Sequence, residues 1–283
     1  MVESEELQII SRLGGLTNTN YLVMYNNEKC VMRYAGEGTS EFINREEEYK
    51  NSTVAESQGI YPKQYYFDRV TGNKITKYIE GCLTMSEQDS KNVFYQKEIA
   101  AIFKKLHTSS EPFVNEFPLE QLMTDYEELC VKGAAKLDER FFSSKRYVQS
   151  LLTKYNNLNV EKVPCHIDPL CENFLWDPTN EKMYIIDFEY SGMYDPLWDL
   201  ADHAIEANYL PEHDESFLTF YYGKGNVNKD IWQRYYMLQI FQDFLWYLWA
   251  SFKTAWGEDF EEYGCMRFER LQRNLKGYQE KYD

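Results

Sequence analysis

The segment CHIDPLCENFLW, residues 165–176, places a histidine, two acids, an asparagine and two cysteines in one turn-rich stretch. A second segment, MYIIDFEYSGMYDPLWDLADH at 183–203, follows after a short gap and adds four more aspartates. Acids this dense beside short apolar runs can hold a metal ion, accept a proton or simply remain solvated. The spacing of the polar residues discriminates among these possibilities.

The composition limits the class of protein. A chain of 283 residues with 43% hydrophobic content can bury a large core, as two modest lobes or one domain. Its formal net charge of −16 argues against a nucleic-acid partner, because phosphate backbones are bound by Lys and Arg. An acidic chain is better suited to cations.

The sequence also indicates the cellular location of the protein and whether it has a membrane partner. The first residues, MVESEELQII, lack a signal-peptide core, and no apolar run reaches the ~18–20 residues that span a bilayer. The six cysteines form no Cys-x-x-Cys pair, which disfavours a zinc or redox motif. We therefore expect a cytoplasmic protein with free thiols and no membrane partner, while the sequence leaves its oligomeric state unknown.

The first 78 residues are rich in predicted strands. Val, Ile, Leu and Tyr between Gly/Asn turns predict antiparallel strands over 7–13, 20–26, 29–35, 63–70 and 74–80. A helix is expected from Asn44, as N-cap, to Ser57.

The remainder of the chain is mostly helical in pattern. Apolar residues at helical spacing predict helices over 94–109, 118–132, 137–155, 196–207, 228–252 and 258–280. Two short apolar pieces, 161–165 and 182–187, are expected to be strands and to form a small β-hairpin. The predicted fold class is therefore α+β, with a small antiparallel β-rich N-terminal lobe and a larger helical C-terminal lobe.

Three polar residues of the opening segment have the spacing H-x-D-x-x-x-x-N, namely His166, Asp168 and Asn173. In protein kinases the Asp of such a loop accepts the proton of the attacking hydroxyl, and the Asn oxygen binds Mg²⁺. Because Mg²⁺ prefers several oxygen ligands, a further carboxylate is needed, and Asp187 at the end of a predicted strand supplies one. The alternative is that each acid only caps a turn.

The D-F-E of residues 187–189 differs from the D-F-G of protein kinases, and the chain has no G-x-G-x-x-G loop. The combination instead resembles the choline/ethanolamine kinase branch of the aminoglycoside phosphotransferase superfamily. It looks closest to bacterial choline kinases that supply phosphocholine for surface polysaccharides. This resemblance implies a protein-kinase-like two-lobed fold, with a nucleotide-binding lobe at 1–78 and a catalytic and substrate-binding lobe at 79–283. It also implies ATP and Mg²⁺ as cofactors.

The resemblance extends to the nucleotide site. It implies phosphate contacts from the LGGLTNTNY loop and from a basic residue in VMRYA, a glutamate partner in INREEEY and adenine contacts from KYIEG. The residues concerned are Thr17, Asn18, Thr19, Arg33, Glu48, Tyr78 and Ile79. Glu46 and Glu47 remain possible partners of Arg33. Without the acidic motifs, an ordinary hairpin turn would be the better explanation of the loop. The alternative for Arg33 and Glu48 is that they are surface charges.

The substrate site is indicated by aromatic residues. Trp246 and Trp249 lie three residues apart on one predicted helix face. A quaternary ammonium has no N–H group, so aromatic faces are the groups that can recognise it. The resemblance implies that this pair boxes the ammonium, with Glu206 as the nearby acid and Tyr190 and Tyr263 as further aromatics. The alternative is that the tryptophans belong to the core.

Other polar residues are interpreted as structural. Asp199 and His166 are expected to brace the segment, and His107 is expected to have a structural role. A zinc site formed by Asp199, His203 and Glu206 is disfavoured because a further strong ligand is missing. Cys165 and Cys171 are interpreted as packing residues.

These patterns predict an enzyme that transfers a phosphoryl group from ATP to the small-molecule substrate choline, with Asp168 as base and with Asn173 and Asp187 on Mg²⁺. Three alternatives stay open. The same chemistry could act on ethanolamine or an aminoglycoside, the chain could be a trimethylammonium-binding module without catalysis, or it could be an inactive kinase-like scaffold. The acid set argues against both non-catalytic alternatives.

Overall fold

The computed structural model describes residues 7–14, 18–36 and 43–283. Its N-terminal part is a five-stranded antiparallel sheet of order β1-β2-β3-β5-β4. The strands are β1 (Leu7–Arg12), β2 (Thr19–Tyr25), β3 (Glu28–Tyr34), β4 (Gln64–Phe67) and β5 (Lys74–Lys77). Asn26 and Asn27, at φ 50° and 61°, form the two-residue turn between β2 and β3, in the conformation such hairpins require.

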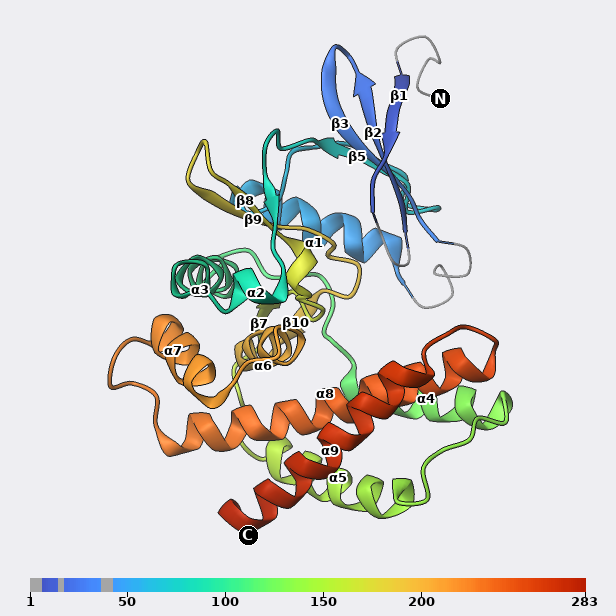
Figure 1. The fold of residues 1–283 in the computed structure, drawn as a ribbon, viewed down its shortest axis with the longest axis vertical. Coiled ribbons are helices and arrows are strands. Elements are labelled where there is room, and N and C mark those ends of the chain that lie inside the picture. Colours follow the sequence, from blue (N-terminus) through green and yellow to red (C-terminus); the bar gives the residue numbers. More distant parts are fainter. Residues whose placement is uncertain (1–6, 15–17, 37–42) are drawn as a thin grey trace.

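Helix α1 (Arg45–Ser57) lies between this sheet and the helical part of the molecule (Figure 1). It begins as predicted, because the side chain of Asn44 accepts hydrogen bonds from the N–H groups of the second and third helical residues. From this helix the buried Asn51 donates to the Asn115 side chain at 2.8 Å and to the Ser191 carbonyl at 3.1 Å. These bonds fix α1 to the C-terminal part.

The C-terminal part is mainly helical. Its helices are α2 (Glu87–Ser90), α3 (Val93–His107), α4 (Leu119–Lys132), α5 (Phe141–Asn156), α6 (Pro196–Glu206), α7 (Pro211–Tyr222), α8 (Lys229–Ala255) and α9 (Glu261–Tyr282). Figure 1 shows α8 and α9 side by side across the lower lobe, with α6 above them. One large core joins these helices to the short strands. Among the described residues, no helix has the length and apolar composition needed to cross a bilayer.

The predicted hairpin of residues 161–165 and 182–187 is wrong. Both pieces are strands, but β7 (Val163–Cys165) pairs with β10 (Gly192–Tyr194), whereas β9 (Lys182–Ile185) pairs with β8 (Phe174–Asp177). β8 also pairs with β6 (Leu83–Thr84). The Asp177 carboxylate accepts the N–H groups of Thr179 and Asn180 and so closes a tight β8–β9 turn. This local turn gives β9 its partner and leaves residues 166–173 as a loop between the two sheets.

Element boundaries differ from the predictions in several places. Helix α7 was not expected, since PEHDESFLTFYY has apolar residues in its second half alone. Helix α5 begins at Phe141 rather than 137, because the Asp138 carboxylate accepts the Arg140 N–H in a preceding turn. The predicted lobe boundary between 78 and 79 lies between β5 and β6. The division into lobes at that point stays a prediction.

Candidate active site

The segment 165–176 is held by one carboxylate. Asp199, in the first turn of α6, accepts the backbone N–H of His166 at 2.7 Å and that of Ile167 at 2.8 Å. Its Oδ2 also lies 2.9 Å from Nε2 of His107, whose Nδ1 lies 2.9 Å from the Tyr221 hydroxyl. Asp199 and His107 are both buried. Their expected structural roles are therefore confirmed by the contacts that they make.

Further contacts hold the same loop from other sides. The Trp198 indole donates to the Ile167 carbonyl at 2.9 Å, and His203 Nδ1 lies 3.0 Å from the Pro169 carbonyl. Ile167 has φ 76°, a strained conformation for a β-branched residue, which these bonds on both its N–H and its carbonyl maintain. The strained residue immediately precedes Asp168, so the surrounding structure determines the position of Asp168.

His166 links this loop to the segment that carries the second predicted metal ligand. Its Nε2 lies 2.8 Å from the Ile186 carbonyl, one residue before Asp187. Burial lowers the pKa of His166, so the imidazole is neutral at physiological pH. The contact agrees with the expectation that His166 orients the loop. Asp187 itself has φ 69°, a second strained residue at the site.

Hydrogen bonds connect Asp168, Asn173 and the residue before Asp187. The Asn173 side-chain amide donates to the Asp168 carbonyl at 3.0 Å, which directs its oxygen away from that carbonyl. The Asn173 carbonyl in turn accepts the Ile186 N–H at 2.9 Å. Burial, followed by the charges of Glu206, Asp187 and Glu189, raises the pKa of Asp168 to about 8 in the free protein.

Arg33 pairs with Glu48, as predicted. Its Nη2 lies 2.7 Å from Glu48 Oε1, and both side chains are almost completely buried. Glu46 instead lies at the surface, 3.1 Å from Lys50. Arg33 also lies 3.0 Å from Asp187, so one guanidinium touches both the helix α1 acid and a predicted metal ligand.

Two buried residues at this point were missed by the sequence analysis. Glu189 lies 3.0 Å from Arg45 and 3.6 Å from Arg33, and Arg45 lies 2.6 Å from Glu48. Burial is the largest of the effects that raise the pKa of Glu189 to about 7. Carboxylate oxygens of Glu48, Asp187 and Glu189 lie within 4.8 Å of one another. The departure from D-F-G to D-F-E was the signal that could have identified Glu189.

Of the other predicted nucleotide residues in the described part of the chain, Asn18 contacts this cluster. Asn18 is buried and its amide approaches Glu189 at 3.4 Å, while Thr19 begins β2. Thr17 lies outside the described residues. The Tyr78 N–H donates to the Lys29 carbonyl at 3.1 Å.

The predicted aromatic residues form a continuous chain of ring contacts. Tyr190 and Trp246 lie 5.9 Å apart between centroids, Trp246 and Trp249 6.1 Å, and Trp249 and Tyr263 6.4 Å, all edge-to-face. They come from the segment after β9, from α8 and from α9. The structure thus brings together four side chains that are up to 73 residues apart in sequence.

Glu206 does not stand free beside these rings. Its Oε1 accepts a hydrogen bond from Arg267 on α9, a buried guanidinium that the sequence analysis did not consider. Arg267 also donates to the Tyr263 hydroxyl at 2.9 Å. The sequence gives no local signal for this pairing because the two helices are joined by about 55 intervening residues.

The residues of the disfavoured zinc site are not grouped in the described part of the chain. Asp199, His203 and Glu206 each bind different partners, and no such set appears among the metal-ligand groups found in the described part of the chain. Cys165 and Cys171 are buried free thiols, which confirms their interpretation as packing residues.

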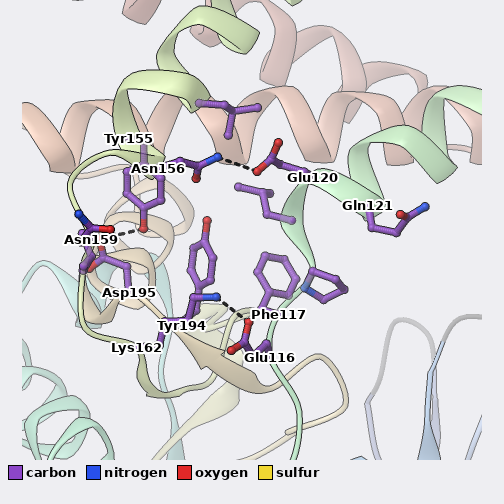
Figure 2. A pocket seen from close by; sticks show the side chains of 14 residues that line it. Glu116, Phe117, Glu120, Gln121, Tyr155, Asn156, Asn159, Lys162, Tyr194 and Asp195 are labelled. Atoms are coloured by element: carbon purple, nitrogen blue, oxygen red, sulfur yellow. Dashed lines mark hydrogen bonds and ion pairs between the residues drawn. The ribbon is translucent and has the colours of Figure 1, made fainter.

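A cavity of about 510 Å³ lies elsewhere, between α4, α5 and the β7–β10 pair (Figure 2). Its polar groups bind one another: Tyr155 donates to Asp195, Asn156 to Glu120 at 2.9 Å, and Lys162 pairs with Glu116 at 2.6 Å. None of the predicted site residues lines it. This cavity is therefore separate from the candidate active site.

The geometry around Glu48 predicts a large effect on stability. Burial by itself would raise the pKa of Glu48, but three surrounding cations outweigh it and lower the pKa to about 2. Glu48→Gln leaves these buried cations without their acid and should reduce the free energy of unfolding by about 3–5 kcal/mol at pH 7. Glu48 stabilises the fold fully above its unfolded pKa of 4.5, so the deficit should shrink as pH falls from there toward 2.

Urea unfolding at several pH values measures this deficit. Glu47→Gln, one position earlier in the same helical turn, is the matched control and should change the free energy of unfolding by less than about 0.5 kcal/mol. Equal losses in the two variants would contradict a special role for Glu48.

Comparison with known proteins gives a consistent result. The model of the choline/ethanolamine kinase family matches residues 9–224. The choline kinase LicA of Streptococcus pneumoniae is 33% identical, with a TM-score of 0.84 over 97% of this chain and 95% of that one. A structure of LicA in complex with AMP is also 33% identical, with a TM-score of 0.83 over 98% of this chain and 94% of that one.

A curated relative, protein LicA of Haemophilus influenzae, is 28% identical over 268 residues, which cover 92% of this chain and 77% of the relative. These likenesses confirm the predicted fold class, an antiparallel sheet followed by a helical part in a protein-kinase-like arrangement. Because the family model spans most of the sequence and relatives above 30% identity cover nearly all of it, this chain belongs to the choline/ethanolamine kinase family.

Proposed function

We propose that this protein transfers the γ-phosphoryl group of ATP to the hydroxyl of choline, with Mg²⁺ as the metal. The observation that carries the proposal is that the acids Asp168 and Asp187 lie near the chain of aromatic rings that begins at Tyr190. Tyr190 follows Asp187 by three residues, and Glu206 beside Tyr263 is close enough to Asp168 to raise its pKa. A hydroxyl tethered to an ammonium group in the aromatic chain would therefore lie near Asp168.

Asp168 is proposed to orient the substrate hydroxyl and to accept its proton. Without a metal, burial and the neighbouring acids raise its pKa to about 8, and the positive charge of a bound Mg²⁺ would lower that pKa toward the ionised form that a base requires. The bonds to Asp199 and Trp198 hold the strained backbone before it, so the carboxylate is positioned without further ordering.

Asn173 and Asp187 are proposed to hold the metal, with Glu189 beside them. The donor set fits Mg²⁺, since it offers an amide oxygen and carboxylate oxygens, and the oxygens of Asp187 and Glu189 lie within 4.8 Å of each other. When bound, the ion would neutralise charge on the phosphate oxygens. Two buried arginines now pair with these carboxylates, Arg33 with Asp187 and Arg45 with Glu189.

The nucleotide is proposed to lie between the N-terminal sheet and this cluster. Arg33 would bind the α- and β-phosphates while Glu48 keeps its guanidinium in place. Asn18 and Thr19, at the start of β2, would contact the phosphates, and Tyr78 and Ile79 would border the adenine. The AMP complex of a relative with 33% identity supports nucleotide binding by this protein.

Trp246, Trp249, Tyr190 and Tyr263 are proposed to surround the trimethylammonium group, with Glu206 adding Coulombic attraction. Aromatic faces suit a cation that has no N–H to donate. Ethanolamine would need hydrogen-bond acceptors in place of these faces, and an aminoglycoside would need a broader acidic cleft. A protein that only binds trimethylammonium groups would also have no need for Asp168, Asn173 and Asp187.

The deciding experiment is an ATP-consumption assay with choline, ethanolamine, an aminoglycoside and homoserine, each with and without Mg²⁺. We expect Mg²⁺-dependent turnover with choline to exceed that with every other substrate. Turnover with ethanolamine alone would overturn the substrate assignment, and no turnover with any of them would overturn the proposed function.

Replacing the proposed base tests its role. Asp168→Asn keeps the shape of the side chain but cannot accept a proton, so kcat should fall by a factor on the order of 10²–10⁴. Steady-state kinetics with choline measures the loss, and nucleotide titration should give an unchanged affinity. Asp125→Asn on α4, outside the site, serves as control; near-normal kcat in the Asp168 variant would remove Asp168 as base.

The aromatic chain is tested at its centre. Trp246→Leu keeps an apolar side chain but removes the ring face, and the loss of a cation–π contact worth ~2 kcal/mol should raise KM for choline roughly 10- to 30-fold. We expect kcat to change little, because this contact is made equally in the ground and transition states. Trp256→Leu, at the exposed end of the same helix, should leave KM unchanged. Equal KM values in both variants would argue against the cage.

A further inference from the structure

Arg267 occupies a central position among the helices that carry the proposed ammonium site. Its side chain is 1% exposed, and each of its nitrogen atoms has a different partner. Nε donates to the Tyr263 hydroxyl at 2.9 Å, Nη2 to Glu206 Oε1, and Nη1 to Asp243 at 3.3 Å. These partners lie on α9, α6 and α8, so a single guanidinium connects all three helices.

Two of these partners are hydrogen-bonding groups at the edge of the aromatic chain. Tyr263 forms the end of that chain, 6.4 Å from Trp249, and its ring also lies 5.0 Å from the guanidinium carbon of Arg267. Glu206 is the acid next to it. Arg267 therefore already occupies an acceptor atom of the carboxylate and the hydroxyl oxygen that a substrate's N–H groups would otherwise use.

The charges around this point are largely balanced before any substrate enters. Glu206 is paired with Arg267, and Asp243 is paired mainly with Arg270, whose Nη2 lies 2.7 Å away. Asp202 lies one helical turn before Glu206 on α6, fully buried, and neither of its oxygens has a partner among the described residues. Burial, and then the charge of Glu206, raises the pKa of Asp202 well above its ordinary value, which favours a neutral carboxyl group.

We propose that Arg267 is a positioning residue that selects quaternary over primary ammonium substrates by occupying Oε1 of Glu206 and the hydroxyl oxygen of Tyr263. The inference rests on the proposed phosphorylation of an amino alcohol at this site. A primary ammonium carries three N–H donors, and each donor that enters a buried site without an acceptor loses its hydrogen bonds to water. A trimethylammonium group has no N–H donors, so it loses no such hydrogen bond when the acceptors are already bound.

The test compares choline and ethanolamine in variants of two arginines on the same helix. Arg267→Met frees Glu206 and Tyr263, and we expect the ratio of kcat/KM for choline to that for ethanolamine to fall by about tenfold or more. Arg270→Met is the matched control, since Arg270 also binds Asp243 but contacts neither acceptor. It should lose stability through Asp243 but keep the wild-type ratio.

Arg267→Lys covers the case in which Arg267→Met does not fold. Lysine retains a cation for the buried acids but carries its donors on one atom, which cannot reach all three partners of Arg267 at once. We expect the ratio to fall in this variant as well, by a smaller factor. Thermal unfolding of each variant confirms that the kinetics report on folded protein.

An unchanged ratio in Arg267→Lys, or an equal change in Arg270→Met, would overturn the inference. Its failure differs from failure of the proposed function. If the wild-type protein phosphorylates choline while the ratio is insensitive to Arg267, the selectivity argument alone is wrong. If the wild-type protein phosphorylates neither amino alcohol, the proposed function is wrong.

Discussion

The carboxylate of Asp199 is the contact on which the rest of the site depends. It accepts two successive backbone N–H groups of the 165–176 segment and touches a buried histidine, so three donors converge on one acid. Those bonds maintain the strained backbone of Ile167 and so determine where Asp168 lies. The contact between His166 and the Ile186 carbonyl connects the same loop to the backbone next to Asp187 and so fixes the position of Asp187.

The two halves of the site use buried arginines in the same way. Arg33 holds Glu48 and touches Asp187, and Arg267 holds Glu206 and touches Asp243. In both places acids that would repel one another in a buried cleft are kept together by a guanidinium, whose flat fork can bind several oxygens at once. The excess of acids in the sequence is thus partly neutralised where it is most concentrated.

Much of the architecture was accessible from local pattern. Strands β1–β3 and helices α1, α3, α4, α6, α8 and α9 lie close to their predicted ranges, because alternation, helical periodicity and the Asn44 cap are encoded within a few residues. The pairing of β7 and β9 was predicted wrongly. Which strands pair depends on the turn at Asp177 and on β10, and the apolar content of the two strands does not encode that choice.

The residues of the candidate site also fall into those predicted from local sequence and those brought together by the tertiary structure. Asp168, Asn173 and Asp187 were predicted from spacing within one loop and one strand end, and Glu206 and the W-x-x-W pair were predicted from the family resemblance. The tertiary structure decided the other contacts. It pairs Arg33 with Glu48 rather than with either neighbouring glutamate, and it brings Arg45 to Glu189. It also places Arg267 against Glu206 and Tyr263. Each of these contacts forms because elements distant in sequence bury charged side chains against one another. A charge that is removed from water is destabilising unless it has a partner, so burial decides which pairs form.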